Sequence, residues 1–84
     1  MNRGHRDYVL LKVNPIVDRY TNGEMFTARG VYDSIRKDTE GVPGVTTSEI
    51  LEALNYLQSQ GIVKRNGYIE RAGSSRRAIK WVKL

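Results

Sequence analysis

The sequence of 84 residues contains no cysteine, and it is poor in several other features that would point to a function. Without cysteine the chain has no disulfide framework, no thiol nucleophile and no thiolate metal site. No apolar run is long enough to cross a bilayer, and the first residues, MNRGHRD, lack the apolar stretch of a signal peptide. We therefore expect a cytoplasmic protein without a membrane partner.

Residues that carry catalytic chemistry are also scarce. The single histidine, His5, lies in a polar stretch near the N-terminus, where we expect it to be solvated. The sequence has no recognisable nucleophile–base pair, pair of catalytic carboxylates or cluster of metal ligands. The segment DTEGVPGV at residues 38–45 lacks the lysine and the serine or threonine of a phosphate-binding loop, so we interpret it as a connector. The sequence predicts a protein that is not an enzyme and that needs no cofactor or small-molecule effector.

Positive charge is present in excess, and it is unevenly distributed. The net charge is +5 and the pI is about 9.8. Residues 61–84 carry seven basic side chains and one acidic side chain, which gives this segment a net charge of +6. Residues 38–60, in contrast, carry four acidic side chains and no basic one. A basic segment of this kind favours an acidic partner, and nucleic acid is the commonest.

Hydrophobic spacing predicts a first helix from about Arg6 to Thr21, followed by a short strand at EMF, residues 24–26. The inward residues of this helix recur at helical spacing and are Val9, Val13, Ile16, Val17 and Tyr20. Pro15 leaves two alternatives, because proline removes one backbone donor and crowds the preceding turn. The helix is either kinked there, or shortened to begin at an Asn14 cap after an extended YVLLKV. We favour the kinked helix.

Two further helices are predicted from their caps as well as from spacing. Thr27 is a suitable N-cap for the segment ARGVYDSIRK, whose inward residues would be Val31, Tyr32 and Ile35. Thr46 and Glu49 have the spacing of a capping box at the start of a third helix. Gly61 follows its last turn, where a left-handed residue commonly ends a helix. The inward stripe of the third helix is expected at Ile50, Leu51, Leu54 and Leu57.

After the third helix the pattern changes to β-branched and aromatic residues separated by turn signals. One interpretation is a single long hairpin with strands at residues 62–70 and 77–83, the tip RAGSS and an irregularity near Gly67. The other interpretation places a tight turn at Asn66 and Gly67 and divides the segment into three shorter strands. We favour the long hairpin, and we expect Trp81 to pack under the helices.

The order of helix, short strand, helix, connector, capped helix and basic hairpin resembles the winged helix-turn-helix fold. The residues that carry the resemblance are TTSEILEALNYLQSQGIVKRNGYI, at 46–69. The resemblance implies an α+β fold, with three helices followed by a C-terminal β-hairpin wing. The resemblance covers about residues 6–84. We expect residues 1–84 to form one winged-helix domain, in which residues 1–5 would be a flexible basic arm. The chain departs from the pattern in two ways, because its third helix has no basic residue and its connector is longer than the tightest turns.

This resemblance implies that the third helix enters the major groove of double-stranded DNA, while the wing contacts the phosphate backbone or the minor groove. A step of about 100° per residue places the polar residues of this helix outward, and a helix start can itself meet a phosphate. The contacts expected from the helix are Thr47, Ser48, Glu52, Asn55 and Tyr56. The contacts expected from elsewhere are Arg29, Lys64, Arg65, Arg71, Ser74, Ser75, Arg76 and Arg77. The chain would then be a sequence-specific DNA-binding protein, a small transcription regulator of viral or phage style.

Other interpretations of the same residues stay open. A charged hairpin can simply protect a sheet edge from aggregation, although a net charge of +6 exceeds that need. The alternative function is that of a protein–protein adaptor, because winged helices also serve in this way and residues 38–60 are acidic. RNA cannot be separated from DNA by sequence. We also expect a homodimer through the first helix, whose apolar residues beyond one stripe are Tyr8, Leu10 and Leu11.

Overall fold

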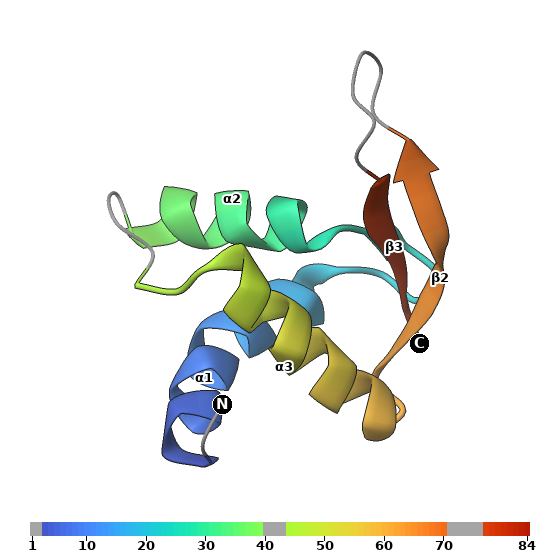
Figure 1. Cartoon of the computed structure of the whole chain (residues 1–84). Helices are drawn as coiled ribbons and strands as arrows, with labels where there is room; N and C mark the ends of the chain where they lie inside the picture. Colours follow the sequence, from blue (N-terminus) through green and yellow to red (C-terminus); the bar gives the residue numbers. More distant parts are fainter. Residues whose placement is uncertain (1–2, 40–43, 71–76) are drawn as a thin grey trace.

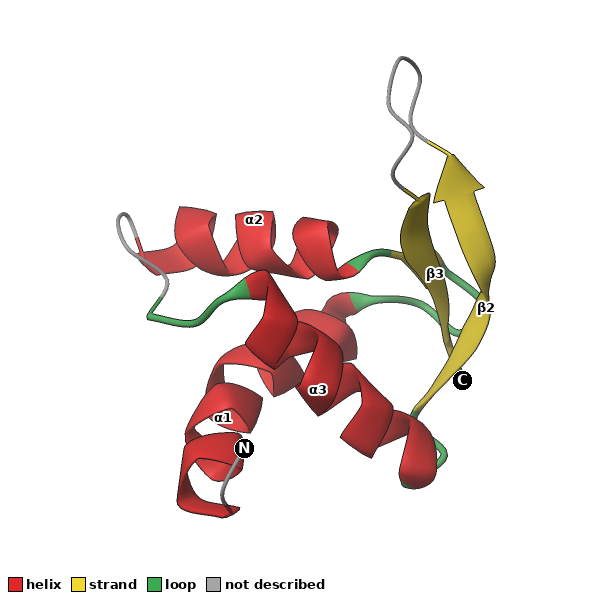
Figure 2. Cartoon of the chain, in the orientation of Figure 1, coloured by secondary structure: helices red, strands yellow, loops and turns green. Residues whose placement is uncertain are grey.

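The computed structural model describes residues 3–39, 44–70 and 77–84. Its elements, in chain order, are α1 (Arg3–Arg19), β1 (Met25–Phe26), α2 (Ala28–Thr39), α3 (Thr47–Ser59), β2 (Val63–Glu70) and β3 (Arg77–Lys83). The three helices gather on one side of the molecule, and the hairpin of β2 and β3 stands on the other (Figure 1). Figure 2 shows the same division between helices and strands. The chain therefore forms a small α+β fold with a three-stranded antiparallel sheet.

Helix α1 is continuous through Pro15, so the alternative with an extended YVLLKV is wrong. Its inward stripe is buried as predicted, at Val9, Val13, Ile16 and Val17. Pro15 itself is exposed, and it has no N–H to donate to the carbonyl oxygen of Leu11 one turn earlier. Burial of the stripe against the other helices offsets this loss, because each fully buried aliphatic side chain contributes about 1.5–3 kcal/mol.

The start of α1 corrects one expectation and adds a contact. The helix begins at Arg3 rather than near Arg6, so the flexible arm expected at residues 1–5 is wrong for Arg3 to His5. His5 is exposed, as expected, and its Nε2 also forms a hydrogen bond with a carboxylate oxygen of Glu49 on α3. This contact gives the first turn of α1 a neighbour to pack on. The helix extends toward the N-terminus beyond its apolar stripe.

The caps of α2 and α3 are those that the sequence predicted. The backbone N–H of Gly30 donates to Thr27 Oγ1 at 3.1 Å, which makes Thr27 the N-cap of α2. The N–H of Glu49 donates to Thr46 Oγ1 at 3.1 Å, and the N–H of Thr46 donates to Glu49 Oε1 at 2.8 Å. These two bonds form the capping box of α3.

The end of α3 fixes how the chain leaves the helix. Gly61 has φ 76°, a left-handed conformation that glycine adopts without a steric penalty. The N–H of Ile62 donates to the carbonyl of Leu57, and the N–H of Gly61 donates to that of Gln58, both at 3.0 Å. This is the Schellman pattern, in which the last carbonyl groups of a helix are satisfied by the residues that leave it. Strand β2 then begins at Val63, close behind the helix.

The long hairpin is confirmed, and the three-strand alternative is wrong. β3 lies in the middle of the sheet, between β1 and β2. The register of β2 against β3 shifts between Arg65, which pairs with Trp81, and Tyr68, which pairs with Ile79. Two residues of β2 therefore oppose one residue of β3, and one of these two is Gly67, with φ 77°. This β-bulge is the irregularity that the sequence indicated near Gly67.

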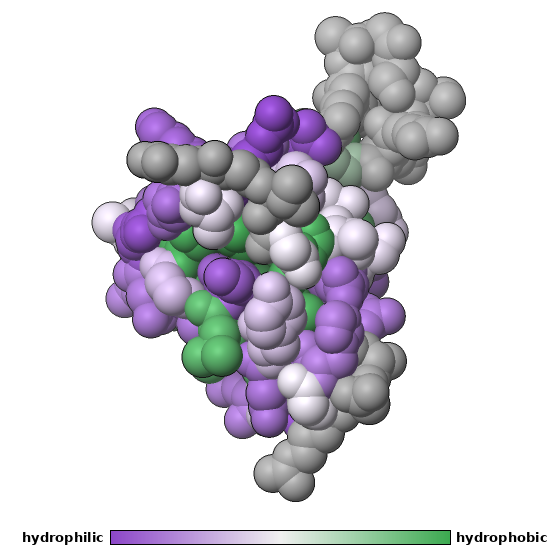
Figure 3. Space-filling model, turned by 90° about the vertical axis from the view of Figure 1, so that its left-hand side faces the viewer, coloured by the Kyte–Doolittle hydropathy of each residue, from purple (hydrophilic) through white to green (hydrophobic). Residues whose placement is uncertain are grey.

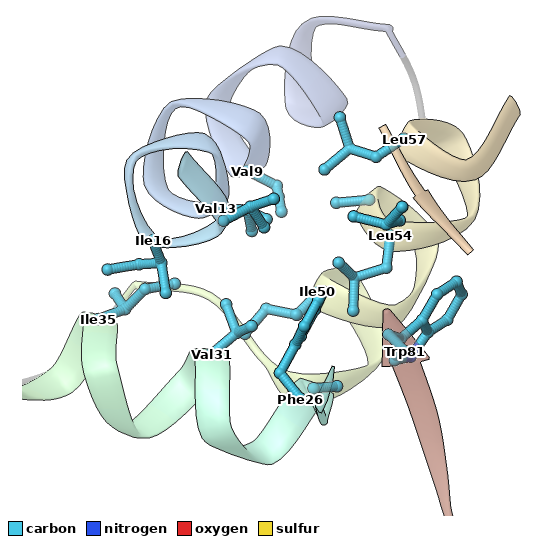
Figure 4. Packing of buried hydrophobic residues seen from close by; sticks show 14 of the residues in the cluster. Val9, Val13, Ile16, Phe26, Val31, Ile35, Ile50, Leu54, Leu57 and Trp81 are labelled. Carbon is cyan, nitrogen blue, oxygen red and sulfur yellow. The ribbon is translucent and has the colours of Figure 1, made fainter. Parts of the chain in front are cut away.

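One hydrophobic core joins all three helices to the sheet. Figure 4 shows side chains of α1, α2 and α3 pointing into a shared interior, with Trp81 of β3 beside α3. Trp81 is completely buried, as expected from the sequence. In α3 the expected stripe needs one change, because Ala53 is fully buried whereas Leu51 is only half-buried. The buried residues of α3 are Ile50, Ala53, Leu54 and Leu57.

Candidate nucleic-acid interface

The surface of α3 opposite its buried residues carries a polar stripe. We define this stripe as Ser48, Glu52, Asn55 and Ser59, all of which are exposed. The spacing of these residues places them on one face, since three or four residues make one helical turn. The sequence predicted this direction from the position of the apolar residues, and the prediction is confirmed for all four. Thr47, expected at the start of the helix, is half-buried in the first turn.

The polar stripe is bounded on one side by α1. Tyr56 lies on that side, and the guanidinium carbon of Arg6 lies 4.3 Å from its ring centroid. The ring is half-buried, so the expectation that Tyr56 points outward like its neighbour Asn55 is wrong. The reason is that the α1 stripe draws the first turn of α1 against α3, where Arg6 covers the ring. Tyr56 and Arg6 belong to the packing between the two helices.

Glu49 lies at the N-terminus of α3 and also contacts α1. The pKa of its carboxyl group is lowered first by the hydrogen bond from His5 and second by that from the backbone N–H of Thr46. The carboxylate at the start of α3 therefore has hydrogen-bond partners within the protein. Neither the sequence spacing nor the cap pattern indicated the partnership with His5, because the two residues are 44 positions apart.

The other side of the polar stripe is bounded by the hairpin. The side-chain oxygen of Gln58 accepts the backbone N–H of Arg65 at 2.7 Å. β2 is an edge strand, so Gln58 satisfies a donor that no neighbouring strand can reach. In the sequence Gln58 looks like an ordinary solvated residue, and its role is visible only once the hairpin lies beside it. The bond holds β2 against α3 directly before the β-bulge.

The two basic residues at the base of the hairpin lie on opposite faces of the sheet. Val63 is buried, so it faces the helices, and Arg65 lies two residues further on the same face. Lys64 points to the opposite face by the same alternation. Both side chains are exposed. Of the two residues expected to act together, Arg65 is therefore the one on the side of α3.

Arg29, expected to hold a phosphate from the start of α2, is engaged within its own helix. Its Nε lies 3.3 Å from a carboxylate oxygen of Asp33, and its guanidinium carbon lies 5.2 Å from the ring centroid of Tyr32. The pair is exposed, so it is screened by solvent and can be exchanged for another anion at small cost. Arg29 therefore remains accessible to a phosphate. Its contacts with Asp33 and Tyr32 lie within α2, so they do not position it relative to α3.

The remaining predicted contacts belong to the segment between the strands. Arg71, Ser74, Ser75 and Arg76 lie outside the described residues. Of Arg77 the backbone is described, as the first residue of β3. The structure thus brings together the polar stripe and Arg65, and it fixes where the chain enters and leaves the tip.

No family model, characterised protein sequence or solved structure matches this chain. None of the helices in the described ranges is long and apolar enough to span a membrane. In the part of the chain that the structure describes, no three acidic, histidine or cysteine side chains come together as metal ligands.

Proposed function

We propose that the chain is a winged helix-turn-helix protein that binds double-stranded DNA sequence-specifically, as a small transcription regulator rather than an enzyme. In this proposal α3 enters the major groove and the β2–β3 hairpin is the wing. The observation that carries the proposal is the exposed polar stripe of α3 beside a hairpin segment with a net charge of +6. A helix with its side chains is about 10–12 Å wide, which matches a major groove about 12 Å wide.

The arrangement of elements supports the same proposal. Helix, strand, two helices and a hairpin follow one another, and the first strand pairs with the last. Because β2 begins directly after α3, the base of the hairpin lies at the C-terminal end of α3 (Figure 1). A helix and a hairpin in these positions can contact adjoining parts of one duplex. The polar stripe and the hairpin then act on the same ligand.

Affinity and sequence readout would come from different elements. Because α3 contains no basic residue, attraction to the phosphates would come from beside it, chiefly from the hairpin, where Arg65, Arg71, Arg76 and Arg77 lie. The polar stripe would read base edges instead. Asn55 can pair with adenine, Ser48 can donate or accept, and Glu52 can accept from the amino group of cytosine. Phosphate contacts supply affinity, and base contacts supply specificity.

The adaptor alternative is less well supported, because much of the acidic segment 38–60 is engaged internally. Asp38 forms an ion pair with Arg19 of α1, with 2.7 Å between the nitrogen and oxygen atoms. Glu49 is held in the capping box and by His5. The third acidic residue that the structure describes in this segment, Glu52, lies in the polar stripe. Of the acidic residues that the structure describes in this segment, Asp38 and Glu49 are thus already paired within the chain.

The test is fluorescence anisotropy with a labelled random-sequence duplex at about 50 and 200 mM salt, a range over which phosphate contacts weaken strongly. We expect salt-sensitive binding, and we expect the Arg76→Ala, Arg77→Ala double variant to lose affinity and to lower the salt slope by about 2. The matched control is Arg36→Ala, Lys37→Ala, which removes the same charge from the last turn of α2.

Loss of binding in the hairpin variant alone would support a local contact. Equal losses in both double variants would show that net charge, and not the hairpin, governs binding. Absence of binding at low salt would refute the proposal and favour the adaptor alternative.

A further inference from the structure

The side of α1 that faces away from α3 carries an apolar surface. Leu11 is 73% exposed and Tyr8 is 42% exposed, and Pro15 follows one turn after Leu11. These three residues are spaced three and four positions apart, so they lie along one face of α1. Figure 3 shows hydrophobic surface on this side of the molecule, framed by hydrophilic surface. Tyr8 and Leu11 thus form an exposed apolar row on this face of α1.

A hollow of about 140 Å³ lies next to Leu11, between α1 and α2. Its lining includes Ile16 and Ile35, which are 3% and 2% exposed, so the hollow reaches down to the hydrophobic core. Its rim is formed by Leu11 and Pro15 of α1 and by Thr39 of α2. An apolar cavity of about 150 Å³ can hold a molecule of the size of benzene. The hollow is therefore large enough for one branched apolar side chain.

We propose that this groove between α1 and α2 binds a second copy of the same chain, with Leu11 of each copy inserted into the hollow of the other. A two-fold interface brings one surface patch against itself, so it requires each projection to lie beside a matching recess. Leu11 and the adjoining hollow meet this requirement within a single patch. A different protein would have to supply its own apolar projection, whereas a second copy already carries one.

The charges at the groove fit the same occupant. Lys12 of α1 and Asp38 of α2 both line the hollow, one on each wall. A two-fold axis that runs along the groove exchanges the walls, so it places Lys12 of one copy toward Asp38 of the other. Asp38 also holds Arg19 of its own chain, and Lys12 lies 6.0 Å from the ring centroid of Tyr8. The patch is thus self-complementary in shape and in charge.

The groove lies away from the candidate nucleic-acid interface. Leu11 and Pro15 face α2, whereas the side of α1 with Leu10, Asn14 and Asp18 faces the C-terminal part of α3. A second copy on the groove would leave the polar stripe and the hairpin of both chains uncovered. Dimerisation through the groove does not depend on the proposed DNA binding, and it can be measured on the free protein.

The first test is sedimentation equilibrium of the full chain up to about 1 mM. We expect a monomer–dimer equilibrium whose dissociation constant rises at least tenfold in Leu11→Glu. The matched control is Met25→Glu, which places the same charge on β1, at an apolar residue that is 55% exposed. It should sediment like the parent. A parent that stays monomeric throughout, or equal weakening by both variants, would overturn the proposal.

The second test separates pairing between copies from effects within one chain. Lys12→Asp and Asp38→Lys should each weaken the dimer, since each brings like charges together across the two-fold axis. An equimolar mixture should restore association, because both contacts between the two different variants again join opposite charges. Loss of the Arg19–Asp38 ion pair within one chain cannot be repaired by mixing. A mixture that associates no better than the separate variants would overturn the arrangement.

Discussion

Glu49 serves two elements at once, because one of its oxygens closes the capping box of α3 and the other meets His5 of α1. Both hydrogen bonds stabilise the ionised carboxylate, which is why its pKa is lowered in the folded chain. A group whose pKa is lower in the folded than in the unfolded chain stabilises the fold where it is ionised. Glu49 therefore couples the acid stability of the protein to the contact between α1 and α3.

Replacement of Glu49 by Gln should reduce the acid sensitivity of folding. The contribution of Glu49 is fully present above its ordinary pKa of 4.5, and it is lost as pH falls from there through the lowered folded pKa. Glutamine keeps an oxygen for the N–H of Thr46, so the capping box survives without a titrating group. Thermal unfolding between pH 7 and pH 3 should show a flatter profile in Glu49→Gln than in the parent.

His5→Ala provides the companion measurement. Because the hydrogen bond from His5 is the largest cause of the lowered pKa, this variant should flatten the same part of the profile to a smaller extent. Parallel profiles for the parent and Glu49→Gln would contradict the role given to this carboxylate.

At the scale of elements, glycine at the end of a helix and glycine inside one have opposite effects. Gly61 ends α3 at φ 76°, a conformation that L side chains rarely adopt. Gly30 lies in the first turn of α2, where a Cβ atom would meet Thr27 Oγ1 at an ordinary contact distance of 3.5 Å. Close helix packing, which a glycine at this position can permit, is therefore not its role in this fold. The backbone conformation alone distinguishes the two positions.

We expect Gly30→Ala to stabilise the protein by up to about 1 kcal/mol, because alanine loses less backbone entropy in a helix. Gly61→Ala should destabilise it by about 1 kcal/mol, since the left-handed conformation is strained for a residue with a Cβ atom. Urea unfolding measures both changes, and each variant is the control for the other. A shift of equal sign in the two variants would show that the distinction is wrong.

At the scale of the whole molecule, α1 separates two surfaces. One side of α1 borders α3 and its polar stripe, and the other borders α2 and the groove with Leu11. The charges that surround the two surfaces differ as well. The basic segment 61–84 belongs to the hairpin, which borders the polar stripe of α3. The two proposed activities should consequently respond to different substitutions.

This separation predicts independent losses. Leu11→Glu should bind a short duplex that holds one copy with the affinity of the parent, measured by anisotropy. Arg76→Ala, Arg77→Ala should retain the dimerisation constant of the parent in sedimentation. Loss of short-duplex binding in Leu11→Glu would place the groove within the nucleic-acid interface and contradict the separation.

The sequence by itself determined the elements and most of the core. The signals that sufficed are local: the caps at Thr27 and Thr46, the helical spacing of apolar residues, and the glycine after α3. Each acts through interactions between residues that are close along the chain. The direction of the polar stripe followed for the same reason, because burial of one helix face exposes the other. These predictions needed no knowledge of which elements are neighbours.

Only the tertiary structure decided which side chains are shared between elements. Tyr56 was expected to point outward from its position on α3, but Arg6 of α1 covers its ring. His5 reaches Glu49, and Gln58 reaches the backbone of Arg65, across separations along the chain that no spacing rule covers. Polar contacts of this kind depend on how helices and strands pack. The packing is set by the total burial of the core, and no single local pattern specifies it.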